Sequence, residues 1–167
     1  MRSGPRFLQH WDNHCHEMPD DILLNKGQII RRCIARVHQE YLGGPANLEN
    51  PTKQDSIVIN IQRASEAAID LTMHFVAQRN LGVPETSRDA FTLLERAAIL
   101  TPATAKQMRA MVGFRNIAVH NYQDLSLDVL RQIVEQHLTD FELFLEECTK
   151  AVSSSSVGGY RPDLDAR

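Results

Sequence analysis

Three side chains that could act on a phosphodiester lie close together near the end of an apolar helical pattern. They are Arg115, His120 and Tyr122. A guanidinium presents a planar fork of donors to phosphate oxygens and stays charged, and an imidazole exchanges its proton near neutrality. The pair could cleave RNA without a metal or cofactor. His120 would move the proton of a ribose 2′-hydroxyl or of the leaving oxygen, and Arg115 would stabilise the charge that builds on the phosphoryl group.

Spacing alone is a weak signal for this chemistry. Any arginine followed five positions later by a histidine fits it, so residue types by themselves favour a surface Arg115 beside a helix-end His120. The corresponding simple interpretation of Tyr122 is a packing tyrosine whose hydroxyl reaches water.

The surrounding residues add a resemblance to a known family. The segment Met111–Tyr122 resembles the signature of HepT-like toxins, within the larger group of HEPN ribonuclease domains. That signature is an arginine, a polar residue, here Asn116, a short spacer and a histidine, and in the HepT subgroup a tyrosine follows two positions later. The likeness extends over residues 18–150 and includes the run Ile59–Asp70 and the downstream Asp124.

The resemblance implies a function and a role for each residue. It implies the toxin of a HepT/MntA-type toxin–antitoxin pair, a metal-independent endoribonuclease with tRNA as the expected substrate. Arg115 would stabilise the scissile phosphate, His120 would act as acid or base, and Asn116 would orient one of them. Tyr122 would be the hydroxyl that an MntA-like nucleotidyltransferase antitoxin blocks with AMP. The added phosphodiester would then compete with RNA for Arg115, and its negative charge would repel the RNA.

A second interpretation is a non-catalytic HEPN helical module that binds a nucleotidyltransferase. The net charge of −3 fits a protein-binding role. The intact set of Arg115, His120 and Tyr122 favours the enzyme, because a scaffold has no chemical need for it.

Helix geometry restricts how the motif can work. At about 100° per residue, Arg115 and Tyr122 lie on nearly the same face of a helix, whereas Arg115 and His120 are about 140° apart. One straight helix therefore cannot direct both at one phosphate. Either the helix loosens near Asn121, or a second subunit completes the site, as in the symmetric homodimers that the resemblance implies.

Composition limits the class of protein. A chain of 167 residues is expected to form one domain with its own core. Cys15, Cys33 and Cys148 are odd in number, which favours reduced thiols and the cytoplasm over a disulfide framework. No apolar run approaches the roughly 20 residues of a membrane span, and the start lacks the core of a signal peptide.

The predicted fold is all-α, with no alternation typical of strands. Apolar periodicity and caps predict an up-and-down four-helix bundle with one short helix before the motif helix. The second helix has two possible starts, Asn50 followed by Pro51, or a capping box of Thr52 with Asp55. The predicted helix starts are Pro19, Asn50 or Thr52, Thr86, Thr101 and Ser126.

Two regions flank the predicted helical domain. Residues 1–17 are expected to be a flexible extension before a domain at 18–152, and 153–167 a disordered tail. A zinc site is a minor alternative for the extension. Its potential ligands are His10, His14, Cys15, His16 and Glu17.

Three further expectations concern side chains inside the domain. Arg63, Glu66 and Asp70 could orient the catalytic arginine or pair with one another along a helix surface. Gly113 could mark a close approach of another backbone. His137 is expected to be a hydrogen-bonded core or interface histidine.

Overall fold

The computed structural model describes residues 19–156, and these form helices joined by short loops. The extension at 1–17, its candidate metal ligands and residues 157–167 lie outside this range. Within residues 19–156 no cluster of His, Cys, Asp and Glu is arranged to hold a metal ion. No helix in the same range is long and apolar enough to cross a membrane.

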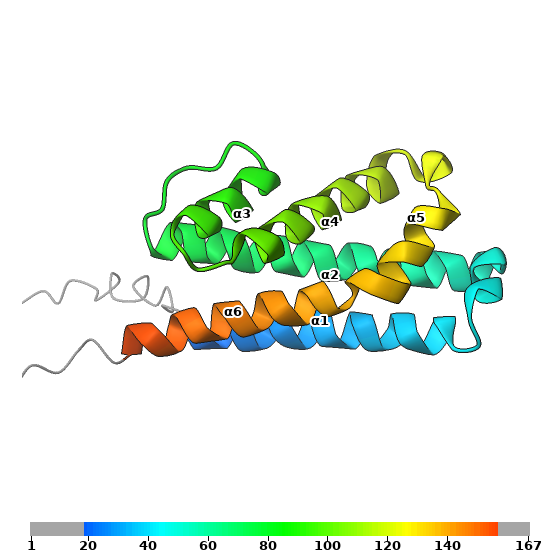
Figure 1. Cartoon of the computed structure of the whole chain (residues 1–167), viewed down its shortest axis with the longest axis horizontal. Helices are drawn as coiled ribbons and strands as arrows, with labels where there is room; N and C mark the ends of the chain where they lie inside the picture. Colours follow the sequence, from blue (N-terminus) through cyan, green and yellow to red (C-terminus); the bar gives the residue numbers. More distant parts are fainter. Residues whose placement is uncertain (1–18, 157–167) are drawn as a thin grey trace, which may run out of the picture.

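Four helical segments run alternately up and down, and both ends of the described chain lie at the same end of the bundle (Figure 1). The short α3 packs between α2 and α4, ahead of the motif helix. No strand is found in the described residues, so the predicted all-α bundle is confirmed. The helices are α1 (Pro19–Tyr41), α2 (Pro51–Gln78), α3 (Ser87–Arg96), α4 (Pro102–His120), α5 (Leu127–Gln132) and α6 (Thr139–Ser156).

Capping residues set the predicted helix starts. The side chain of Asn50 accepts a hydrogen bond from the Lys53 amide, so α2 begins at Pro51 and not at the alternative capping box. Thr86 and Asp89 form the complete capping box of α3. These caps are local, which explains why the sequence predicts them.

The last predicted helix is bent in the structure. A π-helical turn, Ile133–His137, separates α5 from α6, and the two segments are inclined to each other (Figure 1). Such a turn inserts an extra residue into the helical repeat and changes its direction. The Nδ1 atom of the half-buried His137 lies 2.9 Å from Asp140 Oδ2, which confirms a hydrogen-bonded histidine at this position.

The C-terminal boundary was predicted too early. The helix α6 continues through Ser156, beyond the expected end of the domain at residue 152. The hydroxyls of Ser153 and Ser155 donate to carbonyls four residues earlier, and Arg79 donates to Ser155 Oγ and to the Ala151 carbonyl. A serine run favours a linker by composition, but here the two bonds from Arg79, the C-cap residue of α2, hold the last turns of α6 against the bundle.

The core lies between the four helical segments and contains several buried aromatic rings. The rings of Phe91 and Phe144 meet edge to face with centroids 5.9 Å apart. Cys33 and Cys148 are free and buried, and burial raises the pKa of both thiols. Both therefore stay protonated at neutral pH, as expected for structural cysteines.

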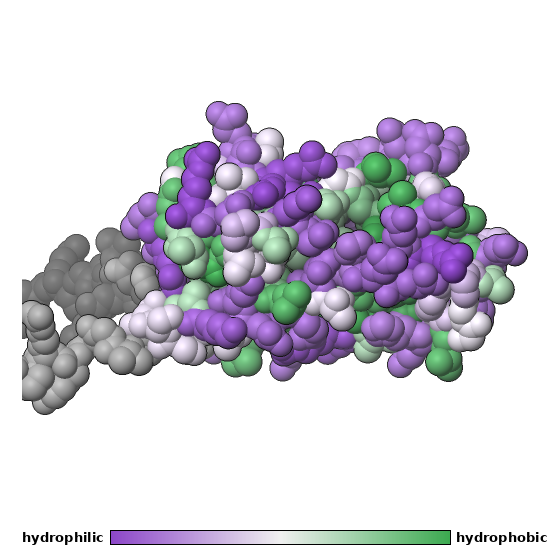
Figure 2. Space-filling view, viewed as in Figure 1, coloured by the Kyte–Doolittle hydropathy of each residue, from purple (hydrophilic) through white to green (hydrophobic). Residues whose placement is uncertain are grey.

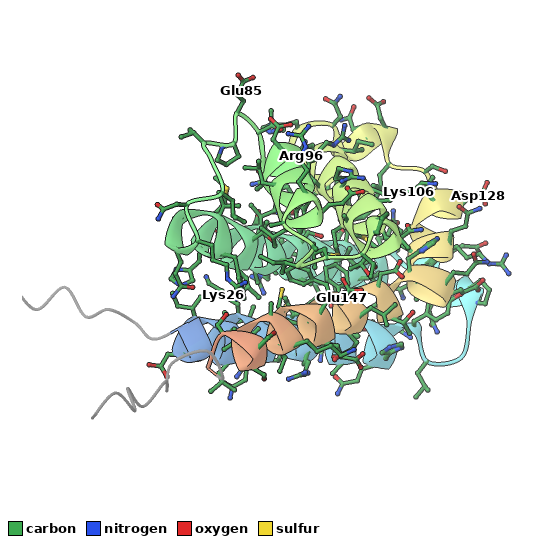
Figure 3. The ribbon with its side chains drawn as sticks, turned by 60° about the vertical axis from the view of Figure 1, so that its left-hand side comes forward. Lys26, Glu85, Arg96, Lys106, Asp128 and Glu147 are labelled. Atoms are coloured by element: carbon green, nitrogen blue, oxygen red, sulfur yellow. The ribbon has the colours of Figure 1, made fainter. Side chains whose placement is uncertain are left out.

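Glu147 on α6 holds the start of the motif helix. Its carboxylate accepts hydrogen bonds from the Thr101 amide (3.0 Å), the Thr101 hydroxyl (2.9 Å) and the buried Thr104 hydroxyl (2.9 Å). Figure 3 shows Glu147 on the side of α6 that faces α4. These bonds fix the N-terminal end of α4, which is opposite to the end that carries the candidate site.

Glu147→Ala is expected to lower the free energy of unfolding by about 1–3 kcal/mol, because it leaves the buried Thr104 hydroxyl without its acceptor. Urea denaturation followed by circular dichroism measures this. The matched control is Glu146→Ala, since Glu146 is exposed on the same helix. Equal stability of the two variants would contradict the capping role.

Candidate functional site

The motif lies on the last two turns of α4, which is helical through His120. One side of this stretch is buried in the core through Phe114 and Ala118. Arg115 is half-buried, and Asn116 and His120 are exposed. The packing therefore leaves the polar motif residues at the surface.

Arg115 is held against α2 by a carboxylate. Its Nε lies 3.5 Å from Glu66 Oε1, and an Nη atom donates to the side-chain oxygen of Asn116 at 3.1 Å. Gln62 donates to the same Glu66 oxygen at 3.2 Å. The Nε atom is shielded from solvent and makes no hydrogen bond within residues 19–156, so the contact with Glu66 is one of charge. Among the described residues the side chain of Asn116 is thus bonded to Arg115, and its role in orienting a catalytic group stays a prediction.

The sequence allowed Arg63, Glu66 and Asp70 to pair with one another along α2, but in residues 19–156 the two carboxylates pair with other helices. Glu66 faces Arg115 on α4, while Asp70 pairs with Lys26 on α1 at 2.8 Å. The two carboxylates are one turn apart and only about 40° apart around α2, and each pairs with the cation that a different neighbouring helix places beside it. Of the two interpretations for this stretch, orientation of the motif arginine is the one that applies to Glu66.

His120 is the last residue of α4 and points to solvent. Within the described chain it has no recorded hydrogen-bond or ion-pair partner. Because α4 stays regular between Arg115 and His120, the two remain about 140° apart around the helix axis. The helix loosens only afterwards, at Asn121 (φ −138°), so a local bend does not bring them together.

Tyr122 begins a short 3₁₀ turn, Tyr122–Asp124, which one residue, Asn121, separates from α4. Its side chain is 40% exposed, and its hydroxyl donates a hydrogen bond to Asp55 Oδ1 on α2. Burial, followed by the hydrogen bond and the charge of Asp55, raises the pKa of Tyr122 to about 12. Sequence reasoning missed this role of Asp55, because the residue also fits a capping box and nothing local indicates a partner 67 positions away.

The close approach expected at Gly113 is made by a side chain. A Cβ atom there would lie 2.5 Å from an Nη atom of Arg88 on α3. The prediction of a neighbouring backbone is therefore wrong. The guanidinium of Arg88 lies over the helix because a glycine leaves room for it.

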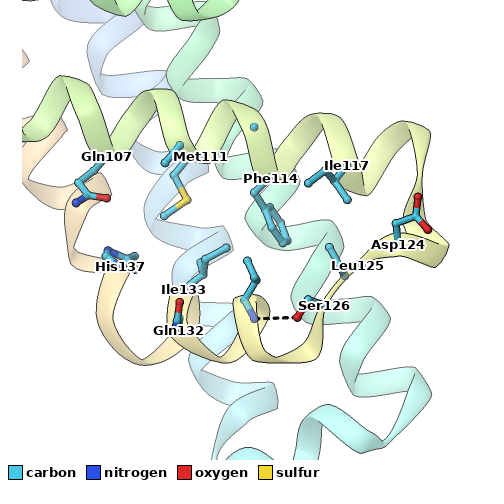
Figure 4. A pocket seen from close by; sticks show the side chains of 13 residues that line it. Gln107, Met111, Phe114, Ile117, Asp124, Leu125, Ser126, Gln132, Ile133 and His137 are labelled. Carbon is cyan, nitrogen blue, oxygen red and sulfur yellow. Dashed lines mark hydrogen bonds between the residues drawn. The ribbon is translucent and has the colours of Figure 1, made fainter.

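An apolar groove of about 440 Å³ runs between α4 and the stretch from Leu125 to the π-helical turn. Met111, Phe114 and Ile117 point across it towards Leu125 and Ile133 (Figure 4). Apolar surface is visible in the same area between the ends of α4 and α5 (Figure 2). The groove thus lies on the flank of the motif helix.

Comparison with known proteins decides the family. A family model described as Ribonuclease HepT-like matches residues 30–148, which is more than half of the chain. The chain belongs to the HepT-like ribonuclease family. This confirms both the predicted family and the ribonuclease class.

Relatives of this HepT-like chain include two named nucleases. The mRNA nuclease HepT of Shewanella oneidensis is 45% identical over 127 residues, which cover 76% of this chain and 96% of the relative. The tRNA nuclease HepT of Aphanizomenon flos-aquae is 31% identical over 87 residues, covering 52% and 59%. The two names differ in the RNA, so tRNA stays a prediction for this chain.

A solved structure shows the same fold with a partner. It is a tri-AMPylated Shewanella oneidensis HEPN toxin in complex with an MNT antitoxin, 45% identical, with a TM-score of 0.73 over 78% of this chain and 98% of that one.

Glu66→Gln in this HepT-like chain is expected to lower kcat for RNA cleavage, because it removes the ion pair that holds Arg115. The loss should be only about two- to fivefold, since this pair is partly exposed and screened by solvent. KM should not rise, since the variant removes a negative charge beside the arginine. Steady-state kinetics on a labelled RNA separate the two constants. Asp70→Asn, which breaks the pair with Lys26, is the control. A raised KM with unchanged kcat would argue against a positioning role.

Proposed function

We propose that this HepT-like chain is the toxin of a toxin–antitoxin pair, a metal-independent endoribonuclease that a nucleotidyltransferase antitoxin of the MntA type neutralises by adenylylating Tyr122. The observation that carries the proposal is the end of α4. A guanidinium held by Glu66 and Asn116 is followed on the same helix by an exposed imidazole and then by a phenol. The tri-AMPylated HEPN toxin bound to an MNT antitoxin supports the form of control.

The proposed cleavage uses the ribose 2′-hydroxyl as nucleophile. His120 takes the proton of that hydroxyl or returns one to the leaving 5′-oxygen, and Arg115 stabilises the charge on the phosphoryl oxygens. The phosphorus–oxygen bond to the next nucleotide breaks as the bond to the 2′-oxygen forms. No metal is needed, because one side chain supplies the charge and the other moves the proton.

The proposed active form is a homodimer. Arg115 and His120 of one chain face in different directions, since α4 is regular between them. A twofold axis near the end of α4 would bring His120 of a second copy towards Arg115 of the first. The fold therefore favours a site shared between two chains.

Adenylylation of Tyr122 would switch the site off by charge and bulk. Tyr122 follows His120 by two positions and lies at the same end of α4 as the motif. A phosphodiester there adds a negative charge that repels the RNA backbone, and the adenosine occupies space beside the motif. Action in the cytoplasm is part of the proposal and agrees with the free, buried Cys33 and Cys148.

The test is cleavage of purified tRNA and of an mRNA by the purified chain, with and without a chelator. Cleavage of one RNA class should persist in the chelator and disappear in Arg115→Ala. Arg96→Ala is the control, because Arg96 is an exposed arginine on α3. Equal cleavage by wild type and Arg115→Ala would reject the catalytic proposal. Harmless expression of the chain without a partner would support a binding module instead.

A further inference from the structure

The hydroxyl of Tyr122 already has an acceptor, the carboxylate of Asp55 in the second turn of α2. Asp55 is exposed and Tyr122 is 40% exposed, so both groups can be reached from outside the bundle. The contact joins residues 67 positions apart in the chain. It is specific to the tertiary fold.

Ordinary structural roles do not account for Asp55. The N-cap of α2 is supplied by Asn50, so Asp55 is not needed to begin the helix. No cation pairs with Asp55 among residues 19–156, and the nearby Lys53 donates to Asn47 Oδ1 at 2.7 Å. Within the described residues the carboxylate thus has no cationic partner, and it accepts a hydrogen bond from Tyr122.

We propose that Asp55 is the general base that activates Tyr122 for transfer of AMP. This inference rests on the proposed function. The Tyr122 oxygen attacks the α-phosphorus of ATP, the new O–P bond forms, and the bond from that phosphorus to the bridging oxygen breaks. Pyrophosphate leaves, and the phenolic proton passes to the Asp55 carboxylate and then to water. A base must lie within hydrogen-bonding reach of the proton that it takes, and Asp55 meets this condition.

The acidity of Tyr122 explains why a base is needed. With a pKa of about 12, the free phenolate would be about one molecule in 10⁵ at pH 7. The neighbouring titratable side chains Lys53, His120 and Asp124 are not among the causes of this shift, whereas Asp55 is. When the neutral phenol transfers its proton to Asp55 during the attack, the reaction does not depend on the small population of phenolate.

The test compares wild type with Asp55→Asn, which keeps the size and an acceptor oxygen but not the basic charge. Each chain is incubated with ATP and the MNT antitoxin of Shewanella oneidensis, and intact-mass spectrometry follows AMP on Tyr122. Glu49→Gln is the matched control, because it removes an exposed carboxylate just before α2. Tyr122→Phe gives the background. Similar Tm values for the four chains establish that each is folded.

Asp55→Asn is expected to slow the transfer by about 100-fold or more near pH 7.5. The ratio to wild type should approach one as the pH rises towards about 9.5, because hydroxide then supplies phenolate. Taking the ratio at each pH cancels the antitoxin's own pH dependence. A constant ratio would mean that Asp55 only ties α2 to the 3₁₀ turn, and a faster variant would mean that it restrains Tyr122. Either result overturns the proposal.

Failure of this inference can be told apart from failure of the proposed function. If wild type is modified on Tyr122 and Asp55→Asn is modified equally fast, only the role of Asp55 is wrong. If wild type cleaves RNA but takes up no AMP on Tyr122, the proposed control and the role of Asp55 are both wrong.

Discussion

His120→Ala is expected to lower kcat/KM for RNA cleavage by about 10²–10⁴-fold, the range for loss of a general acid or base. His120 is exposed and has no recorded partner within residues 19–156, so its removal should leave the fold intact. Initial rates on a fluorescent RNA substrate measure the loss. A denaturation midpoint equal to that of wild type excludes unfolding as the cause.

His38→Ala is the matched control for this prediction. His38 is an exposed histidine in the last turn of α1, away from the motif. It should cleave RNA at the wild-type rate. A His120→Ala variant as active as His38→Ala would remove the histidine from the mechanism and leave Arg115 as a binding residue only.

Mixing two inactive variants is expected to restore activity. If each site takes Arg115 from one chain and His120 from the other, a dimer of Arg115→Ala with His120→Ala contains one site with both residues intact. Random pairing makes half of the dimers mixed, so the mixture should reach about a quarter of wild-type activity. The prediction follows from the roughly 140° between the two residues on α4.

The mixing experiment needs subunit exchange, which mild denaturation and refolding of the combined chains provides. The control is each variant refolded alone, which should stay inactive. Continued inactivity of the mixture, with mixed dimers shown by native mass spectrometry, would place both residues of a site in one chain. The regular helix between Arg115 and His120 would then have to deform when RNA binds.

One face of α2 contacts both Arg115 and Tyr122. Asp55 and Glu66 are eleven residues apart, which places them within about 20° of each other around the helix. Glu66 holds the guanidinium proposed to bind RNA, and Asp55 holds the hydroxyl proposed to receive AMP. Substitutions on this face of α2 should therefore alter cleavage and its control separately, according to which carboxylate is removed.

The sequence by itself determined the features that depend on near neighbours in the chain. The capping box of Thr86 and Asp89 and the cap at Thr101 are satisfied within three residues, and apolar periodicity defined the buried helix faces. The motif residues Arg115, His120 and Tyr122 were likewise found from a short segment, through its resemblance to HepT-like proteins. Their roles remain predictions that the proposed experiments test.

Only the tertiary structure decided the partners of these residues. Glu66 could have paired along its own helix, and Asp55 could have capped it, because both alternatives satisfy the local spacing rules. Packing of α2 against α4 and the following turn selected Arg115 and Tyr122 instead. Contacts between side chains distant in sequence depend on how whole helices pack, and a short segment does not specify which helix will pack against it.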